Sequence, residues 1–278
     1  IPLFTQLPFL FLEAYAAADG SFWVLQAGYL GLCALVLAVP AALSGAAYPL
    51  AVAAAGGRAA AGPVYAWNAL GAVAGALAVG HVAVGIIGTQ AILIILAGLV
   101  AAGAAILTMY VSGDHARSPL RVGRRVAPVL VLVFLVVAVA IPDWPGHVLL
   151  SGPAVRPEVY MMVSREAQDR RAAWLRWMLR GQVVSLEEGR NSVIGVMDYP
   201  GPVRTLLVSG KPDASDSVVA DLRTQYLAAH LPLAMHPRPQ TVAIIGLGSG
   251  ATAGAALAHP VREVTCFEIE PAIGRALP

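Results

Sequence analysis

The C-terminal part of the chain is organised around one segment, Thr241-Val-Ala-Ile-Ile-Gly-Leu-Gly-Ser-Gly250. Its first half is a short apolar run of β-branched residues, and its second half contains three glycines at alternate positions. A helical stretch follows over 251–259, and a second apolar run over 264–267 leads directly to Glu268. A strand, a glycine turn, a helix, a second strand and an acid form the opening of a nucleotide-binding α/β sheet.

The glycine turn is the predicted ligand-binding loop. Glycines let the backbone turn tightly and approach a ligand without a Cβ clash, and the following helix presents free N–H groups. We therefore assign Gly246, Gly248, Ser249 and Gly250 to a nucleoside site, with Glu268 placed to accept both ribose hydroxyls. The GxGxG spacing differs from the dinucleotide fingerprint GxGxxG. It favours a methyltransferase-type, Rossmann-like domain that holds S-adenosylmethionine or a relative.

The first half of the chain has the composition of a membrane region. The 278 residues are 58% apolar and only 12% charged, whereas soluble domains carry about 25% charged residues. About 20 helical residues cross a bilayer core, and four runs with no charged residue approach or exceed this length, at 22–43, 64–87, 91–111 and 127–142. The fourth is the shortest and needs its flanks or a thinner bilayer. We expect 1–142 to be a multi-pass α-helical region of a bacterial inner membrane.

The side of the membrane on which the second half lies is left open. Four arginines and one aspartate lie in 112–126, which the positive-inside rule places in the cytoplasm. If the fourth run crosses, the part from Asp143 onward is external; if it returns, that part is cytoplasmic. The cytoplasmic side is favoured because an adenosyl donor is a cytoplasmic metabolite. His81 is the only ionisable residue within the runs, which gives ion-coupled transport little support.

The second half has the composition of a soluble domain, and we divide it into three parts. These are a linker with an amphipathic helix over 143–182, a β-hairpin and helix over 183–240, and an incomplete first β-α-β unit over 241–278. The hairpin strands are expected at 192–198 and 203–208. The amphipathic helix, at 164–180, carries tryptophans and arginines that suit a membrane interface or, as favoured here, packing on its own domain.

Several other classes of site are excluded. A net charge of +2 without a basic stretch gives no reason to expect nucleic-acid binding. Cys33 and Cys266 form neither a disulfide framework nor a metal-ligand pair. His230, His236 and His259 match no known metal spacing, so no metal is expected.

A series of short motifs recurs in order along the chain. They are Glu187-Glu-Gly189, 207–214, Thr224-Gln225, 230–233, 245–250 and 267–270. Together they resemble the spermidine synthase (polyamine aminopropyltransferase) family. Upstream motifs at 44–49, 65–68 and 143–144 resemble its membrane-fused branch. In that branch, helices similar to those of the major facilitator superfamily precede the synthase-like domain.

The resemblance implies transfer of an aminopropyl group from decarboxylated S-adenosylmethionine to a small amine such as putrescine. Glu268 matches the acid that holds the ribose, and Gln225 matches a position facing the polyamine. Three positions depart from the family, since Ser192, Ser209 and Ser249 replace its Gln or Asp residues. The donor, decarboxylated or parent, and the acceptor amine are therefore open. The lipid bilayer is the other expected partner, and a homodimer is left open.

The catalytic residues are unassigned, because the family's general base, an Asp, lies on a later strand and is expected beyond Pro278. The chain lacks an initial Met and a signal peptide, and we expect a fragment that alone lacks catalysis. The interpretation is a membrane-bound, synthase-like transferase using an S-adenosylmethionine-type donor. Two alternatives stay open. One is a polyamine or solute transporter or sensor with a degenerate nucleoside-binding domain, and the other is an S-adenosylmethionine-dependent methyltransferase.

Overall fold

The computed structural model describes residues 2–111, 132, 138, 140–201, 203–219 and 221–276. Contacts divide the chain into two compact units. The helical unit is formed by Gly31–Asp143, and the mixed unit is formed by Pro2–Leu30 with Trp144–Pro278. The division falls after Asp143, and the first 30 residues group with the second half rather than with the expected membrane region.

The helical unit consists of apolar helices. Its elements are the greater part of α2 (Phe22–Ala54), a 3₁₀ turn (Gly57–Ala60), α3 (Ala61–Ala78), a π-helical turn (Val79–Ala83) and α4 (Val84–Val111). The segments Phe22–Ala38 and Pro40–Ala54 of α2 meet at 47°, since Pro40 lacks the N–H that would continue the hydrogen-bond ladder. Three of the predicted runs fall on α2, α3 and α4. The run 127–142 and the arginine segment 112–126 lie almost entirely outside the described residues.

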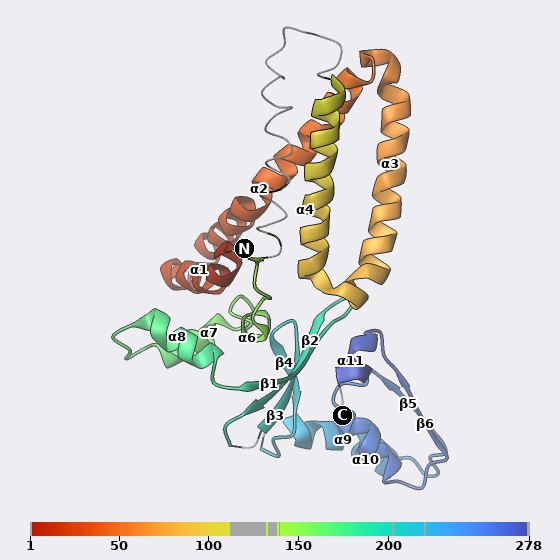
Figure 1. Ribbon diagram of the computed structural model, residues 1–278. Coiled ribbons are helices and arrows are strands. Elements are labelled where there is room, and N and C mark those ends of the chain that lie inside the picture. The colour runs from red at the N-terminus through yellow and green to blue at the C-terminus, as the bar shows by residue number, and fades with distance from the viewer. Residues whose placement is uncertain are drawn as a thin grey trace. The chain divides into compact units, whose positions relative to one another are not determined.

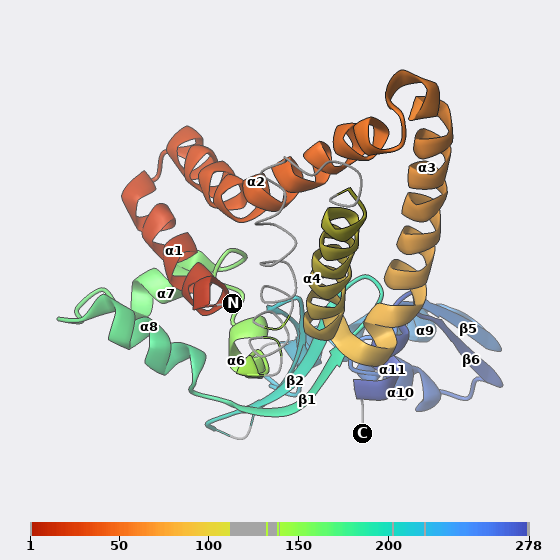
Figure 2. The same ribbon diagram turned by 45° about the horizontal axis from the view of Figure 1, so that its top comes forward.

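One helical stretch of the described chain, Gly57–Gly103, is long and apolar enough to cross a membrane, and the bent α2 is a second if it counts as one span. The 47 residues of Gly57–Gly103 would reach about 70 Å if the helix were straight, which is more than twice the thickness of a ~30 Å hydrocarbon core. The backbone leaves the helix at Gly88, where φ is 78° and ψ is 160°, a conformation that is essentially confined to glycine. Figures 1 and 2 show α3 and α4 as separate rods, side by side and joined at one end.

The mixed unit contains a four-stranded antiparallel sheet, in the order β1-β2-β3-β4. Its strands are β1 (Gln182–Glu188), β2 (Val193–Tyr199), β3 (Val203–Val208) and β4 (Lys211–Ser215). The predicted hairpin is present as β2 and β3, paired from Tyr199↔Val203 to Ile194↔Val208. The outer strands were not predicted, because Glu187, Glu188, Pro212 and Asp213 give them weak strand propensity. They form because pairing with the hairpin satisfies their backbone groups.

The glycine segment lies in a second, two-stranded sheet of the mixed unit. Here β5 (Thr241–Ile245) and β6 (Glu263–Phe267) pair in parallel, as the strand-turn-helix-strand pattern predicts. The helix between them is α10 (Ala251–Leu257), and α9 (Asp221–Met235) packs beside it. Mostly small side chains allow the two helices to approach each other and the sheet closely, namely Ala229, Leu233, Ala255 and Ala256. The last helix, α11 (Pro271–Ala276), packs on the four-stranded sheet.

The remaining helices of the mixed unit are α1 (Pro2–Ala18), α6 (Gly146–Leu149), α7 (Pro157–Val163) and α8 (Arg170–Met178). Leu12 of α1 has no exposed surface and packs with Tyr160, Trp174 and Met178. This packing explains why α1 groups with the second half of the chain.

Helix α8 is shorter than the predicted 164–180, because residues before Arg170 form turns. The Asp169 side chain caps the helix by accepting the Ala172 N–H at 3.0 Å. Trp174 is 1% exposed, and its Nε1 donates to the Tyr160 carbonyl and to Ser164 Oγ. Packing of the helix on its own domain, the favoured alternative, is therefore what the structure shows for this tryptophan.

Candidate functional site

The glycine loop between β5 and α10 has a left-handed backbone. The φ angles are 88° at Gly246, 53° at Gly248 and 78° at Gly250, a region that L-residues with a side chain adopt at a cost. No atom lies within 4 Å of where a Cβ would stand at any of the three. Glycine is thus required here by the backbone conformation, and the space beside the loop is open.

Glu268 stands at the end of β6 and holds the loop. One of its carboxylate oxygens accepts the Leu247 N–H at 2.7 Å, and the other accepts the Glu270 N–H at 2.9 Å. The N–H of Glu270 and those of Leu247, Ile269 and Gly248 lower the pKa of Glu268 below its usual value, against the opposing effect of burial. The predicted ribose acid and the predicted loop are therefore in direct contact, and Glu268 is held ionised.

Gln225 and Ser249, predicted from separate motifs, are brought together. The hydroxyl of Ser249 donates to Gln225 Oε1. Thr252 Oγ1 donates to the Gln225 carbonyl at 3.0 Å, and Gln225 Nε2 contacts the Ser215 carbonyl at 3.5 Å. Helix α9 thereby connects the glycine loop to the end of β4. A side chain predicted to face the acceptor thus borders the loop predicted to hold the donor.

Glu270 was not singled out by the sequence motifs as a site residue. It is 4% exposed, and its carboxylate accepts the N–H of Asn191 at 2.8 Å and that of Ala272 at 3.1 Å. Burial raises the pKa of Glu270, but hydrogen bonds from Asn191, Ala272 and their neighbours outweigh burial, so the net pKa is lowered. Pro271 signals the first position of a helix, but no local signal points to the contact between Glu270 and Asn191.

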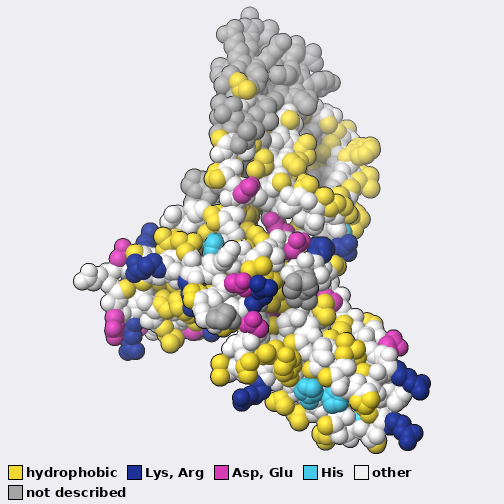
Figure 3. Space-filling view, turned by 60° about the horizontal axis from the view of Figure 1, so that its bottom comes forward, with side chains coloured by type: hydrophobic (Ala, Val, Ile, Leu, Met, Phe, Trp, Pro, Cys, Tyr) yellow, Lys and Arg dark blue, Asp and Glu magenta, His cyan; other side chains and the backbone are white. Residues whose placement is uncertain are grey.

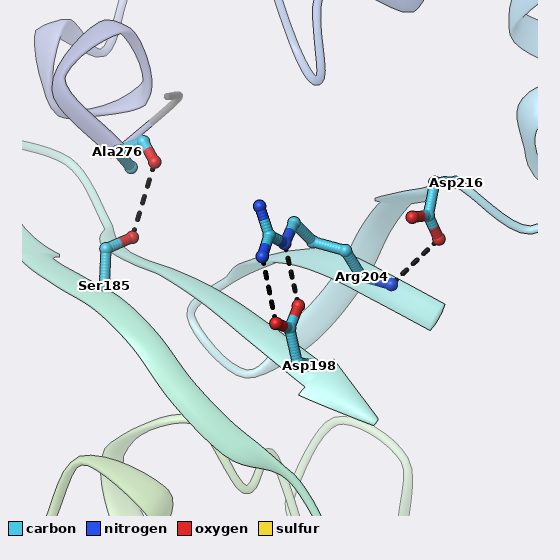
Figure 4. Close-up of polar contacts among 5 residues, drawn as sticks. All are labelled: Ser185, Asp198, Arg204, Asp216 and Ala276. Carbon is cyan, nitrogen blue, oxygen red and sulfur yellow. Dashed lines mark hydrogen bonds and ion pairs between the residues drawn. The ribbon is translucent and has the colours of Figure 1, made fainter. Parts of the chain in front are cut away.

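A cavity of about 220 Å³ lies between the four-stranded sheet and the glycine loop. Most of its walls are apolar, formed by Val196, Leu206, Ala214, Leu222 and Ala251, and its polar lining comes from Arg204, Ser215, Asp216 and Ser249. The guanidinium of Arg204 forms a bidentate pair with the Asp198 carboxylate, at 2.7 and 2.9 Å. The backbone N–H of Arg204 donates to the Asp216 carboxylate (Figure 4). These charges are therefore satisfied within the chain. In the same view Ser185 donates to the Ala276 carbonyl and ties β1 to α11.

Two of the three histidines weighed as metal ligands lie together. His230 Nδ1 and His259 Nε2 are 2.8 Å apart, and Figure 3 shows histidines gathered on one face of the molecule. His236 instead accepts the N–H of Arg238. In the described part of the chain, no group of three or more His, Cys, Asp or Glu residues is placed to hold a metal ion.

The comparison with known proteins gives one partial similarity. No family model matches the chain. Polyamine aminopropyltransferases from two strains of Leptospira biflexa serovar Patoc are 44% identical to it over 48 residues. The match covers 17% of this chain and 17% of each relative. Over that short segment, the chain is similar to a polyamine aminopropyltransferase.

Proposed function

We propose that the full-length protein is a membrane-associated transferase whose α/β part binds the nucleoside of an S-adenosylmethionine-type donor. The observation that carries this proposal is the contact between Glu268 and the glycine loop. Parallel pairing of β5 and β6 brings an ionised carboxylate beside the backbone N–H of Leu247. Ligands of open α/β sheets bind at this edge, beyond the carboxyl ends of the strands.

The acceptor oxygens of Glu268 suit the two hydroxyls of a ribose. A carboxylate offers about four acceptor positions. Backbone N–H groups of Leu247 and Glu270 occupy one on each oxygen of Glu268, with those of Gly248 and Ile269 nearby, so ribose hydroxyls would share this carboxylate with the loop. Two neighbouring hydroxyls on a ribose are donors at a matching spacing. The glycines leave room for the nucleoside to approach, since a Cβ at Gly246, Gly248 or Gly250 would meet no other atom.

The transfer itself would be a displacement at the carbon next to the donor's sulfonium. The acceptor nitrogen forms a bond to that carbon, the carbon–sulfur bond breaks, the thioether nucleoside leaves, and the ammonium product loses one proton to a base. Positioning two reactants for such a step supplies much of the acceleration. In this chain Gln225 and the cavity beside Ser249 are the groups placed to orient the acceptor amine.

The membrane part is proposed to hold this unit at the inner membrane, with the α/β part in the cytoplasm where the donor is made. The break at Gly88 supports two passes, because the helical residues on its two sides, 61–87 and 89–111, would be about 40 Å and about 35 Å long, and each length crosses a ~30 Å core. A charge-free surface supports burial in lipid. None of the α3 or α4 residues is Asp, Glu, Lys or Arg.

The test is calorimetric titration of the full-length protein in a neutral detergent with three nucleosides: decarboxylated S-adenosylmethionine, S-adenosylmethionine and methylthioadenosine. We expect the decarboxylated donor to bind most tightly, and Glu268→Gln to weaken binding at least tenfold. Glu263→Gln is the matched control, because Glu263 is an exposed acid on the same strand, β6. Tighter binding of S-adenosylmethionine would indicate methyl transfer instead. Failure of all three to bind would overturn the nucleoside site.

A second candidate, a sensor that binds without catalysis, is favoured by one observation. A polyamine carries several positive charges and needs carboxylates to offset its desolvation. The acid that lines the cavity, Asp216, already accepts the Arg204 N–H, and Ser249 contributes only a hydroxyl. Nucleoside binding without transfer to putrescine, spermidine or a simple alkylamine would favour this candidate over the transferase.

A further inference from the structure

A second cavity lies in the mixed unit, away from the glycine loop. It has a volume of about 80 Å³ and lies among α6, α7, the end of α8 and the end of β2. Its polar lining includes Arg156, Arg180 and His147, and its aromatic lining comes from Tyr160, Trp177 and Tyr199. None of the residues that line it is Asp or Glu. The cavity therefore gathers basic groups, and no acid is part of its lining.

Arg180 is held in place by aromatic rings. Its guanidinium carbon lies 3.2 Å from the Trp177 ring centroid and 4.7 Å from that of Tyr199. No carboxylate lies within ion-pair distance of it among the residues that the structure describes. Partial burial lowers the pKa of Arg180, with Tyr199 and Tyr160 acting in the opposite direction. The arginine is thus a solvent-exposed cation that stacks on two aromatic rings and has no carboxylate partner in the described chain, and its planar fork of donors suits a bidentate oxyanion.

The two other basic residues of the lining, Arg156 and His147, each have a partner within the chain. Arg156 pairs with Glu158 at 3.3 Å, but both side chains are half exposed, and such surface pairs contribute little energy and exchange readily. His147 Nε2 lies 2.8 Å from the Gly181 carbonyl. Because a carbonyl only accepts hydrogen bonds, the ring donates from Nε2 in this contact.

We propose that this cavity binds a phosphate group through Arg180 and Arg156. The group is either free inorganic phosphate or the headgroup phosphate of a lipid. A volume of about 80 Å³ exceeds the liquid volume of one water, about 30 Å³, so the cavity has room for a small tetrahedral oxyanion. The site is independent of the proposed transferase function.

The first experiment titrates the full-length protein in neutral detergent with inorganic phosphate, followed by calorimetry. We expect saturable binding that weakens at least tenfold in Arg180→Gln and by a smaller factor in Arg180→Lys, which keeps the charge without the fork. Arg176→Gln is the matched control, since Arg176 is exposed at the end of α8, four residues before Arg180, and does not line the cavity. Absence of phosphate binding to the wild type, or equal binding by Arg180→Gln, would overturn the proposal.

A second experiment separates the two sources of phosphate and guards against misfolding. The protein is reconstituted in bilayer discs of a phosphate-free galactolipid alone or with phosphatidylglycerol, and the phosphate titration is repeated. Binding that is unchanged by phosphatidylglycerol assigns free phosphate, whereas competition by phosphatidylglycerol assigns the lipid headgroup. The melting temperature of Arg180→Gln serves as the check on folding. A variant that keeps the wild-type melting temperature and loses phosphate affinity places the effect at this cavity.

Discussion

Glu270 and Asn191 are 79 residues apart in the chain, yet the Asn191 backbone N–H donates to a Glu270 carboxylate oxygen at 2.8 Å. The bond joins the turn between β1 and β2 to the start of α11. The approach is close at this point, since a Cβ at Gly189 would overlap the same carboxylate. One buried acid therefore connects the antiparallel sheet to the segment that contains the glycine loop.

Replacing Glu270 should weaken the connection between the two sheets and lower the stability of the protein. Glu270→Gln keeps one acceptor oxygen but directs an NH₂ group towards a backbone donor, and hydrogen bonds to a charged group contribute about 1.5–3 kcal/mol. We expect a loss of stability in that range, measured by thermal unfolding of the detergent-solubilised protein. Glu263→Gln, on an exposed position of β6, should change stability by less than about 0.5 kcal/mol. Equal melting of the two variants would remove the connecting role of Glu270.

Acid should destabilise the mixed unit by protonating the carboxylates of Glu268 and Glu270. The pKa values of Glu268 and Glu270 are both lowered in the folded chain from an ordinary value of 4.5. The folded state therefore binds fewer protons than the unfolded state, so the stabilisation is complete above about pH 4.5 and is lost as the pH falls through the lower folded values. We expect the melting temperature to fall from about pH 5 downward.

Asp198 complicates this profile, because Arg204 lowers its pKa as well. The informative quantity is thus the difference in melting temperature between the wild type and Glu270→Gln at each pH. That difference should be largest near neutral pH and should shrink in acid. A difference that is constant from about pH 3 to about pH 7 would show that ionised Glu270 does not stabilise the fold.

The segment 241–268 was predicted well because its signals are local. Strand propensity in Thr241–Ile245, left-handed glycines and the helix that follows are each read within a few residues. The role of Glu270 and the pairing of β1 depend on residues tens of positions away, which no periodicity records. The position of α1 is a similar case. Its apolar composition resembles that of a membrane segment, and only packing of Leu12 on Trp174 distinguishes the two.

Two glycines near the proposed nucleoside site provide a matched pair. Gly250 has a φ of 78° at the start of α10, whereas Gly254 lies inside that helix, and at both positions a Cβ would have no other atom within 4 Å. Gly250→Ala should cost about 1–2 kcal/mol from backbone conformation alone. Gly254→Ala should stabilise by about 0.5–1 kcal/mol, since alanine is the better helix former. Thermal unfolding of both variants should show a lower melting temperature for Gly250→Ala and a higher one for Gly254→Ala. Destabilisation by Gly254→Ala would contradict the helix assignment.

The break at Gly88 gives a prediction about membrane topology. If α3 and α4 are separate passes, Arg58 and Thr108 lie at their outer ends on one side of the membrane, and Thr89 lies at the break on the other side. Cys33 and Cys266, the only two cysteines, are first replaced by serine. Single cysteines at 58, 89 and 108 are then labelled in sealed vesicles with an impermeant maleimide. Labelling of 58 and 108 from one side and of 89 from the other is expected. Protection of position 89 from both sides would instead place the break within the bilayer and make Gly57–Gly103 a single bent insertion, because a maleimide reacts only with a thiol that water reaches.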